Sequence, residues 1–287
     1  EIFDEFICPA VIGNYKGLNS ADSILFANFR ADRMRQITTA IFDPTFNSFY
    51  RKNFFLLNSS NSMTSYSSHL DNFIEPLFKK EKIKGTLGEA ISNAGLKQFR
   101  IAETEKYAHI TFFLNGGKEI AYKGEKRVLV SSPDVPTYNL QPEMSAYKVT
   151  KHLIRAINTQ KYQLLIVNFA NPDMVGHTGD AEATIKAIET VDNCLDSIYK
   201  SVRETNGHLM ITSDHGNAEK MLDEDNLTPF TAHTSNLVPF ILVSGNKKYK
   251  LKTGTLSDIA PTILSLMNIE PPKQMTGTSL IKKVLKQ

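Results

Sequence analysis

The chain has 287 residues, of which 41% are apolar and 22% charged, a composition that excludes a disordered protein. Its net charge of +3 is too small to indicate nucleic-acid binding, and no apolar run approaches the ~20 residues of a membrane span. The two cysteines, Cys8 and Cys194, cannot form a disulfide framework, and no signal peptide is recognisable, so we expect a cytoplasmic protein.

The N-terminal part of the chain predicts one buried strand at residues 23–29. Residues 21–26 could equally start a helix, but the sequence then turns abruptly from apolar to basic. Residues 37–55 are rich in aromatic side chains and predict a helix or a packed irregular segment. Residues 58–69 are dense in Ser and Asn, which is typical of a flexible loop or linker, and we expect a domain boundary near or just after them.

The next part of the chain predicts a helix at residues 86–94, which Gly95 would end. Residues 99–102 and 109–114 are strand candidates, and Asn115-Gly116-Gly117 predicts a hairpin-like turn. Residues 131–143 are rich in Pro and predict a loop.

Helices and buried strands alternate in the remainder of the chain. The predicted helices cover residues 145–158, 181–203 and 257–267, and the predicted strands cover residues 164–169, 208–212 and 238–243. This alternation predicts an α/β fold whose mostly parallel sheet is flanked by helices.

Three polar clusters lie beside these strands. Asp173 and His177 follow the strand at 164–169, Asp214 and His215 follow the strand at 208–212, and His233 precedes the strand at 238–243. Carboxylates and imidazoles without a thiolate suit Mn²⁺, Zn²⁺ or Fe, and five such groups are enough for two metal ions. Taken singly, however, an Asp after a strand is more often a helix cap, and a lone His usually has a structural role.

A group of cations predicts an anion site. Arg30, Arg33 and Arg35 lie together, and Lys106 follows the strand at 99–102. Arginine binds phosphate and carboxylate through paired donors. The alternative is a solvated basic surface.

Six blocks of the sequence, in one order, closely resemble the cofactor-independent (2,3-bisphosphoglycerate-independent) phosphoglycerate mutases of the alkaline phosphatase superfamily. These blocks are FANFRADRMRQ, IAETEKYAHITFFLNGG, PEMSAYKVT, NFANPDMVGHTG, ITSDHGNAEKM and TAHTSNLVPFIL. The family spells part of the fifth block TADHGN. Ser213 replaces its Ala here, beside a predicted ligand, and we expect little effect.

The resemblance implies a phosphatase-like domain into which a transferase domain is inserted. Residues 1–78 would be the C-terminal part of the transferase domain, and residues 79–287 the C-terminal part of the metal-binding domain. The implied activity interconverts 3-phosphoglycerate and 2-phosphoglycerate in glycolysis through a phosphoserine, without 2,3-bisphosphoglycerate. We expect no partner other than this small substrate, and a monomer at full length.

The resemblance also implies roles for individual residues. Asp173, His177 and His233 would bind one Mn²⁺, and Asp214 and His215 would bind a second; Mg²⁺, Zn²⁺ or Co²⁺ are alternatives. The substrate would be held by three further side chains, Arg30, Arg33 and Lys106.

The sequence departs from the family in lacking two motifs. The family's chain opens with a strand that carries another Asp ligand, and its nucleophilic Ser follows later; neither motif occurs in this sequence. We therefore expect a C-terminal fragment that is inactive alone. Two alternatives are a metal-dependent phosphatase or sulfatase of the same superfamily, and a non-catalytic fragment that pairs with a separate N-terminal piece.

Overall fold

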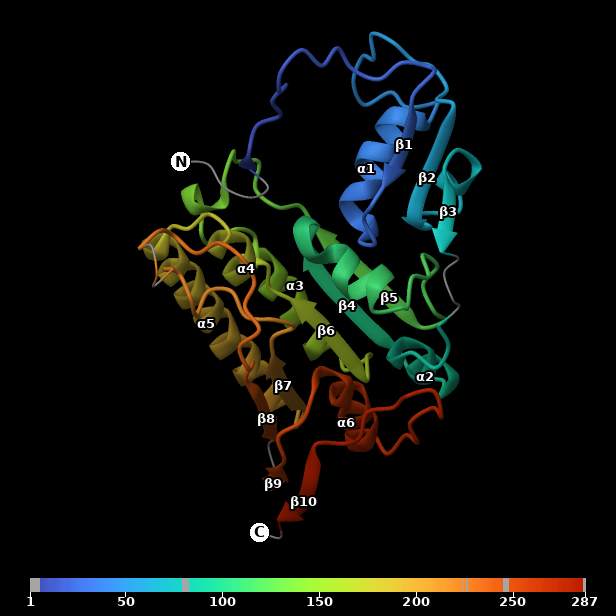
Figure 1. Ribbon diagram of the computed structural model, residues 1–287. Helices are drawn as coiled ribbons and strands as arrows, with labels where there is room; N and C mark the ends of the chain where they lie inside the picture. Colours follow the sequence, from blue (N-terminus) through green and yellow to red (C-terminus); the bar gives the residue numbers. More distant parts are fainter. Residues whose placement is uncertain (1–5, 79–82, 224, 226, 245–247, 286–287) are drawn as a thin grey trace. The chain divides into compact units, whose positions relative to one another are not determined.

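The computed structural model describes residues 6–78, 83–223, 225, 227–244 and 248–285. The chain divides into two compact units, Pro9–Lys82 and Ile83–Gln287, the second of which also includes the residues up to Cys8. The predicted domain boundary after residue 78 adjoins residues 79–82, which lie outside the described residues. Strands β1 to β3 and helix α1 belong to the first unit, and the other elements labelled in Figure 1 belong to the second.

The 9–82 unit contains a parallel three-stranded sheet of order β1-β2-β3. Its elements are β1 (Ser23–Phe26), α1 (Ala31–Phe42), β2 (Ser59–Thr64), the 3₁₀ turn η2 (Leu70–Asn72) and β3 (Glu75–Phe78). The predicted buried strand at 23–29 is shorter than expected, and no residue of β1 is buried. It is an edge strand whose exposure alternates, because successive side chains point to opposite faces of the sheet. The aromatic-rich stretch is both helical and irregular, since α1 ends at Phe42.

Residues 59–64 of the Ser- and Asn-rich segment form the middle strand of this sheet, so the prediction of a flexible loop was wrong for them. Strand β2 pairs with β1 on one side and with β3 on the other. Ser62 is buried, and its hydroxyl donates to the carbonyl of Thr64 at 2.9 Å. Pairing on both sides satisfies the backbone donors and acceptors, which outweighs the weak strand propensity of Ser and Asn.

The central sheet of the 83–287 unit has the order β5-β4-β6, and all its pairs are parallel. Its strands are β4 (Gln98–Glu103), β5 (Glu125–Val130) and β6 (Leu164–Asn168). Ala102, near the end of β4, pairs with Asn168, the last residue of β6. Residues that follow β4 and β6 therefore emerge at the same end of the sheet, beyond the carboxyl ends of its strands. Ligand sites of α/β proteins form at this end.

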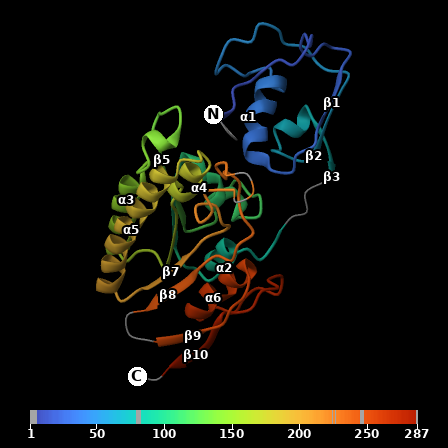
Figure 2. The same cartoon turned by 60° about the vertical axis from the view of Figure 1, so that its left-hand side comes forward.

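Helices cover both faces of this sheet, as Figures 1 and 2 show. Leu165 and Val167 of β6 pack into a core with helices α3 (Ala146–Asn158) and α5 (Ala181–Glu204). Leu164 and Ile166, which alternate with them, pack into a second core with α2 (Leu87–Asn93) and α6 (Ile259–Leu266). An apolar run whose two alternating sets of side chains both pack into a core is typical of a strand inside such a three-layer arrangement. The predicted α/β class with helices flanking parallel strands is confirmed.

The remaining strand pairs are antiparallel. They are β7 (His208–Thr212) with β8 (Phe240–Ser244), and β9 (Lys248–Leu251) with β10 (Ile281–Leu285). In the first pair, Thr212 at the end of β7 lies opposite Phe240 at the start of β8. The chain that leaves β7 thus returns to β8 at the same end of the pair.

Two predicted local structures near the sheet edge were wrong. Residues 109–114 do not form a strand, because His109–Phe113 is a π-helix, η4, that buries Ile110 and Phe112. The turn at residues 115–117 leads into β5, which runs parallel to β4, so it closes no hairpin. A short apolar run does not by itself distinguish a strand from a buried helical segment.

The other helices lie close to their predicted positions. Thr86 caps α2 by accepting from the backbone N–H of Glu89 at 3.3 Å, and Gly95 has the positive φ expected after a helix. Short 3₁₀ turns occur at η3 (Thr104–Lys106), η5 (Tyr138–Leu140) and η6 (Leu256–Asp258). Among the helices that the structure describes, none combines the length and apolarity needed to cross a membrane.

Candidate metal centre

Asp173 and His177 project from one turn of helix. The segment after β6 is helix α4 (Asn171–Gly176), and Pro172 lies at its start, where a missing N–H costs no hydrogen bond. Residues four apart lie on the same face of a helix, so the carboxylate and the imidazole meet. The Asp173 Oδ1 and His177 Nε2 atoms are 3.2 Å apart.

His233 reaches the same place from the loop before β8. Its Nε2 lies 3.0 Å from Asp173 Oδ1 and 3.1 Å from His177 Nε2. The antiparallel pairing of β7 and β8 explains this position, because it returns the loop to the end of β7. One carboxylate oxygen and two imidazole nitrogens therefore form a nearly equilateral triangle.

The orientation of the His177 ring leaves a lone pair in this triangle. Its Nδ1 lies 2.6 Å from the carbonyl oxygen of Thr231, which only accepts hydrogen bonds. In the neutral ring the Nδ1 therefore donates, and Nε2 carries the lone pair. A hydrogen bond from the far nitrogen of a ligating imidazole is the usual way in which proteins hold such a ring toward a metal.

The size of the triangle fits a divalent cation. Bonds of roughly 2.1 Å in an octahedral site place adjacent ligand atoms about 3.0 Å apart, whereas a tetrahedral site places them about 3.4 Å apart. The observed separations of 3.0, 3.1 and 3.2 Å are closer to the octahedral value. Three acceptor atoms at these distances repel one another unless a proton or cation lies among them, so the residues present fit a metal ion.

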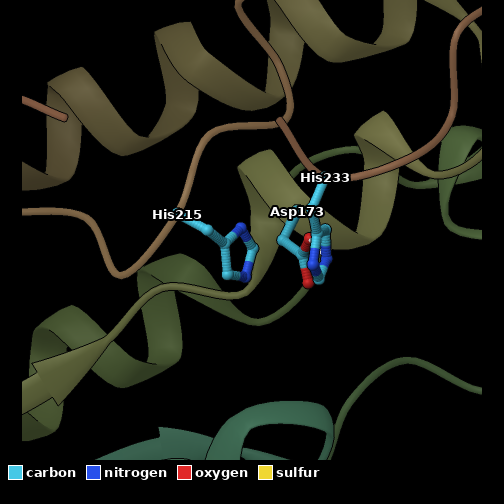
Figure 3. A group of neighbouring side chains, drawn as sticks. All are labelled: Asp173, His215 and His233. Atoms are coloured by element: carbon cyan, nitrogen blue, oxygen red, sulfur yellow. Dashed lines mark hydrogen bonds and ion pairs between the residues drawn. The ribbon is translucent and has the colours of Figure 1, made fainter. Parts of the chain in front are cut away.

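His215 extends the cluster toward Asp214. Figure 3 shows His215 and His233 reaching Asp173 from two different segments of the connection between β7 and β8. The His215 and His233 rings stack with their centroids 3.7 Å apart, and ligand atoms of Asp173, His215 and His233 all lie within 4.8 Å of one another. Asp214 lies outside this group, and its side chain is 57% exposed, but its Oδ2 is 3.6 Å from His215 Nε2.

Asp173 is ionised, and its side chain is only 13% exposed. Burial alone would raise the pKa of its carboxyl group, but the contacts with His177 and Lys106 hold that pKa far below its usual range. The ammonium group of Lys106 forms an ion pair with Asp173 Oδ2, and this lysine is itself buried. The Nδ2 group of Asn217 donates to Asp173 Oδ1 at 3.3 Å.

His233 is kept neutral by its surroundings. Burial lowers the pKa of its imidazole, and the neighbouring His215 and His177 lower it further, while Asp173 acts in the opposite direction. A neutral imidazole is the form that binds a metal ion. The site thus combines one carboxylate that stays charged with a His233 imidazole that keeps its lone pair.

The two predicted arginines belong to the other unit. Arg30 immediately precedes helix α1, and Arg33 lies in its first turns; both side chains are exposed. The Nε of Arg30 donates to Asp32 Oδ1 at 3.0 Å. Arg30 and Arg33 therefore share one helix terminus within the 9–82 unit.

Sequence reasoning missed the residues that support the cluster. Thr231 contributes through its backbone carbonyl, which no side-chain pattern reveals. Asn217 and Glu219 lie two and four residues after His215, and they contact Asp173 and the His233 loop, respectively. The motif ITSDHGNAEKM contains both residues, but nothing in the residue spacing distinguishes them from solvent-exposed polar side chains.

Comparison with known families is consistent with this geometry. The profile of the metalloenzyme superfamily matches residues 24–271 of the chain. The chain belongs to this superfamily.

Relatives within the superfamily carry a more specific name. A protein of Ehrlichia ruminantium is 54% identical over 280 residues, and one of Legionella pneumophila (strain Lens) is 49% identical over 283 residues. Both are 2,3-bisphosphoglycerate-independent phosphoglycerate mutases, which confirms the resemblance drawn from the motifs. The alignments cover 98% and 99% of this chain but only 54% and 55% of those proteins, so the chain spans about half their length.

A solved structure shows the same fold. The Leishmania mexicana phosphoglycerate mutase, determined at low cobalt concentration, superposes with a TM-score of 0.84 at 29% identity. The match covers 95% of this chain and 52% of that one.

Proposed function

We propose that this chain supplies the metal ligands and substrate-binding cations of a phosphoglycerate mutase. The reaction would interconvert 3-phosphoglycerate and 2-phosphoglycerate through a phosphoserine, without 2,3-bisphosphoglycerate. The observation that carries the proposal is the triangle of Asp173 Oδ1, His177 Nε2 and His233 Nε2, with edges of 3.0 to 3.2 Å. The names of the curated relatives support the same reaction.

In this proposal two Mn²⁺ ions are held by separate groups of residues. Asp173, His177 and His233 hold the first, and Asp214 and His215 contribute to the second. When bound, such ions stabilise negative charge on phosphoryl oxygens and lower the pKa of a coordinated hydroxyl group. His215 stacks on His233, and its Nε2 faces Asp214, so it joins the two groups.

The chain's own cations would bind the substrate. Lys106 lies against Asp173 at the sheet edge, where it offers a positive charge to a phosphoryl group. Arg30 and Arg33 present paired donors suited to phosphate and carboxylate oxygens. We assign these arginines to the transferase part, residues 1–78, and Lys106 to the metal-binding part, residues 79–287.

Calorimetric titration with Mn²⁺ tests the site. We expect the chain to bind Mn²⁺ and His233→Ala to bind it more than about 100-fold more weakly, because outer-shell partners alone are worth 10–100-fold. His152→Ala is the matched control, since His152 is exposed on α3. Equal affinity of the parent and His233→Ala would remove His233 from the ligand set.

Product analysis tests the reaction class. The chain is incubated with Mn²⁺ and 3-phosphoglycerate, and the products are separated. We expect no turnover by the chain alone, because the nucleophilic Ser motif does not occur in its sequence. Formation of 2-phosphoglycerate would nevertheless support the mutase, whereas release of inorganic phosphate and glycerate would indicate a hydrolase of the same superfamily. Mn²⁺-dependent binding of 3-phosphoglycerate, weakened in Arg33→Met, tests the substrate site without requiring turnover.

A further inference from the structure

The carboxylate of Glu219 connects two segments of the β7–β8 loop, one of which carries His215 and the other His233. Its Oε2 accepts from the backbone N–H of Asn217 at 2.7 Å, in the loop that follows β7. Its Oε1 accepts from the hydroxyl of Thr234 and from the Nδ2 group of Asn236 at 2.9 Å, both in the loop that precedes β8. One side chain therefore bonds to both segments of the loop, with one oxygen on each.

A backbone contact beside Glu219 also joins the two segments of the β7–β8 loop. Gly216 and Thr234 form an isolated antiparallel bridge, in which the N–H of Thr234 donates to the carbonyl of Gly216 at 2.9 Å. A Cβ atom on Gly216 would lie 2.2 Å from both Glu219 Oε1 and Thr234 Oγ1, so only glycine allows this approach. Gly216 and Thr234 are the direct neighbours of His215 and His233 in the chain.

We propose that Glu219 is a positioning residue that holds His215 against His233 and so sets the spacing of the metal ligands. The inference rests on the metal site of the proposed function. The chain between the two histidines is too long to fix their separation by itself, because a flexible loop of this length has many conformations. The three bonds to Glu219 restrict those conformations before the metal binds, and ordering of this kind tightens metal sites.

The test compares Glu219→Gln with the parent chain in two measurements. Gln has nearly the same shape, but its amide group presents a donor to partners that also donate. We expect Mn²⁺ affinity to fall by about 10–100-fold. We also expect the visible spectrum of the Co²⁺-saturated chain to change, since its bands report ligand number and geometry. Stabilisation of the fold alone would leave the spectrum at saturation unaltered.

A second variant distinguishes the loss of the Glu219 hydrogen bonds from a general folding defect. Thr234→Val removes one hydroxyl donor while keeping the side-chain shape. Because this hydroxyl acts through Glu219, we expect a smaller loss of Mn²⁺ affinity than in Glu219→Gln, and little further loss in the double variant. Additive losses in the double variant would contradict a shared contact.

Asp258→Asn provides a matched control. Asp258 also joins two segments of the same unit, accepting from the backbone N–H groups of Thr255 at 2.8 Å and Thr278 at 2.7 Å. We expect Asp258→Asn to keep the parental Mn²⁺ affinity and Co²⁺ spectrum. Parental affinity and spectrum in Glu219→Gln, with binding lost in His233→Ala, would overturn the role of Glu219 alone. Absence of Mn²⁺ binding by the parent chain would overturn the metal site as well.

Discussion

At the scale of single residues, the two carboxylate oxygens of Asp173 lie in different environments. Oδ2 pairs with the ammonium of Lys106, while Oδ1 faces the imidazoles of His177 and His233. A buried charge that loses its partner is costly, because the interior cannot solvate it as water does. Lys106 therefore neutralises Asp173 from one side and leaves the other oxygen directed toward the ligand triangle.

Lys106→Met tests this division of the carboxylate. We expect the free energy of unfolding without metal to fall by about 3 kcal/mol, since a buried carboxylate loses its cation. With saturating Mn²⁺ we expect a smaller loss, because a bound cation compensates the same charge. Urea denaturation with and without Mn²⁺ measures both values.

Lys200→Met is the control for this experiment. Lys200 pairs with Asp196 at 2.6 Å on the exposed surface of α5, and such pairs contribute less than about 1 kcal/mol. An equal loss of stability in Lys106→Met with and without Mn²⁺ would show that Lys106 and the metal site are independent.

At the scale of the elements, strand β4 ends in a buried carboxyl group just before Lys106. Glu103 is 1% exposed, and its Oε2 accepts from the hydroxyl of Ser132 at 2.9 Å. Burial raises the pKa of Glu103 to about 7, despite the hydrogen bonds from Ser132 and the Ser145 backbone. Because the pKa of this group in the unfolded chain is near 4.5, the folded chain binds the proton more tightly between pH 4.5 and about 7. Stability from this group is present at pH 4.5 and is lost as the pH rises through 7.

Glu103→Gln removes this titration. Gln keeps an acceptor for Ser132 and replaces the protonated oxygen by an amide group. We expect the variant to exceed the parent in unfolding free energy by on the order of 2 kcal/mol at pH 8, and by much less at pH 4.5. Urea denaturation at both pH values tests this, with Glu189→Gln on the exposed side of α5 as control. A stability difference that is the same at both pH values would contradict a buried, protonated Glu103.

At the scale of the whole molecule, the five predicted metal ligands belong to the 83–287 unit, whereas Arg30 and Arg33 belong to the 9–82 unit. Each unit has its own sheet. A ligand stabilises the part of a protein that must be folded to bind it. Metal binding should therefore protect one unit selectively.

Hydrogen exchange with peptide resolution measures this selectivity. At a Mn²⁺ concentration of about 100 times Kd, stabilisation amounts to about 2.7 kcal/mol, or roughly a hundredfold slower exchange for amides that open with the whole unit. We expect this slowing in β4, β6 and α5 but not in β1, β2 and β3. His233→Ala should abolish it. Equal protection of both units would show that they open as one.

The sequence by itself was sufficient for the features that depend on local patterning. The periodicity of the 145–158 and 181–203 segments predicted α3 and α5, and Thr86 and Gly95 marked the ends of α2. The short apolar run at 164–169 predicted β6. These features follow from side-chain spacing and backbone capping within a few residues, so neighbouring residues in the chain carry the information.

Only the tertiary structure decided which segments meet. It made residues 59–64 of the Ser- and Asn-rich segment a central strand, turned residues 109–113 into a π-helix, and placed Glu219 between two segments of the β7–β8 loop. Sequence patterns identified the candidate imidazoles and carboxylates but did not give the distances between their ligand atoms. The physical reason is that pairing, burial and loop–loop hydrogen bonds join residues distant in the chain, and these long-range free energies override local propensity wherever that propensity is weak.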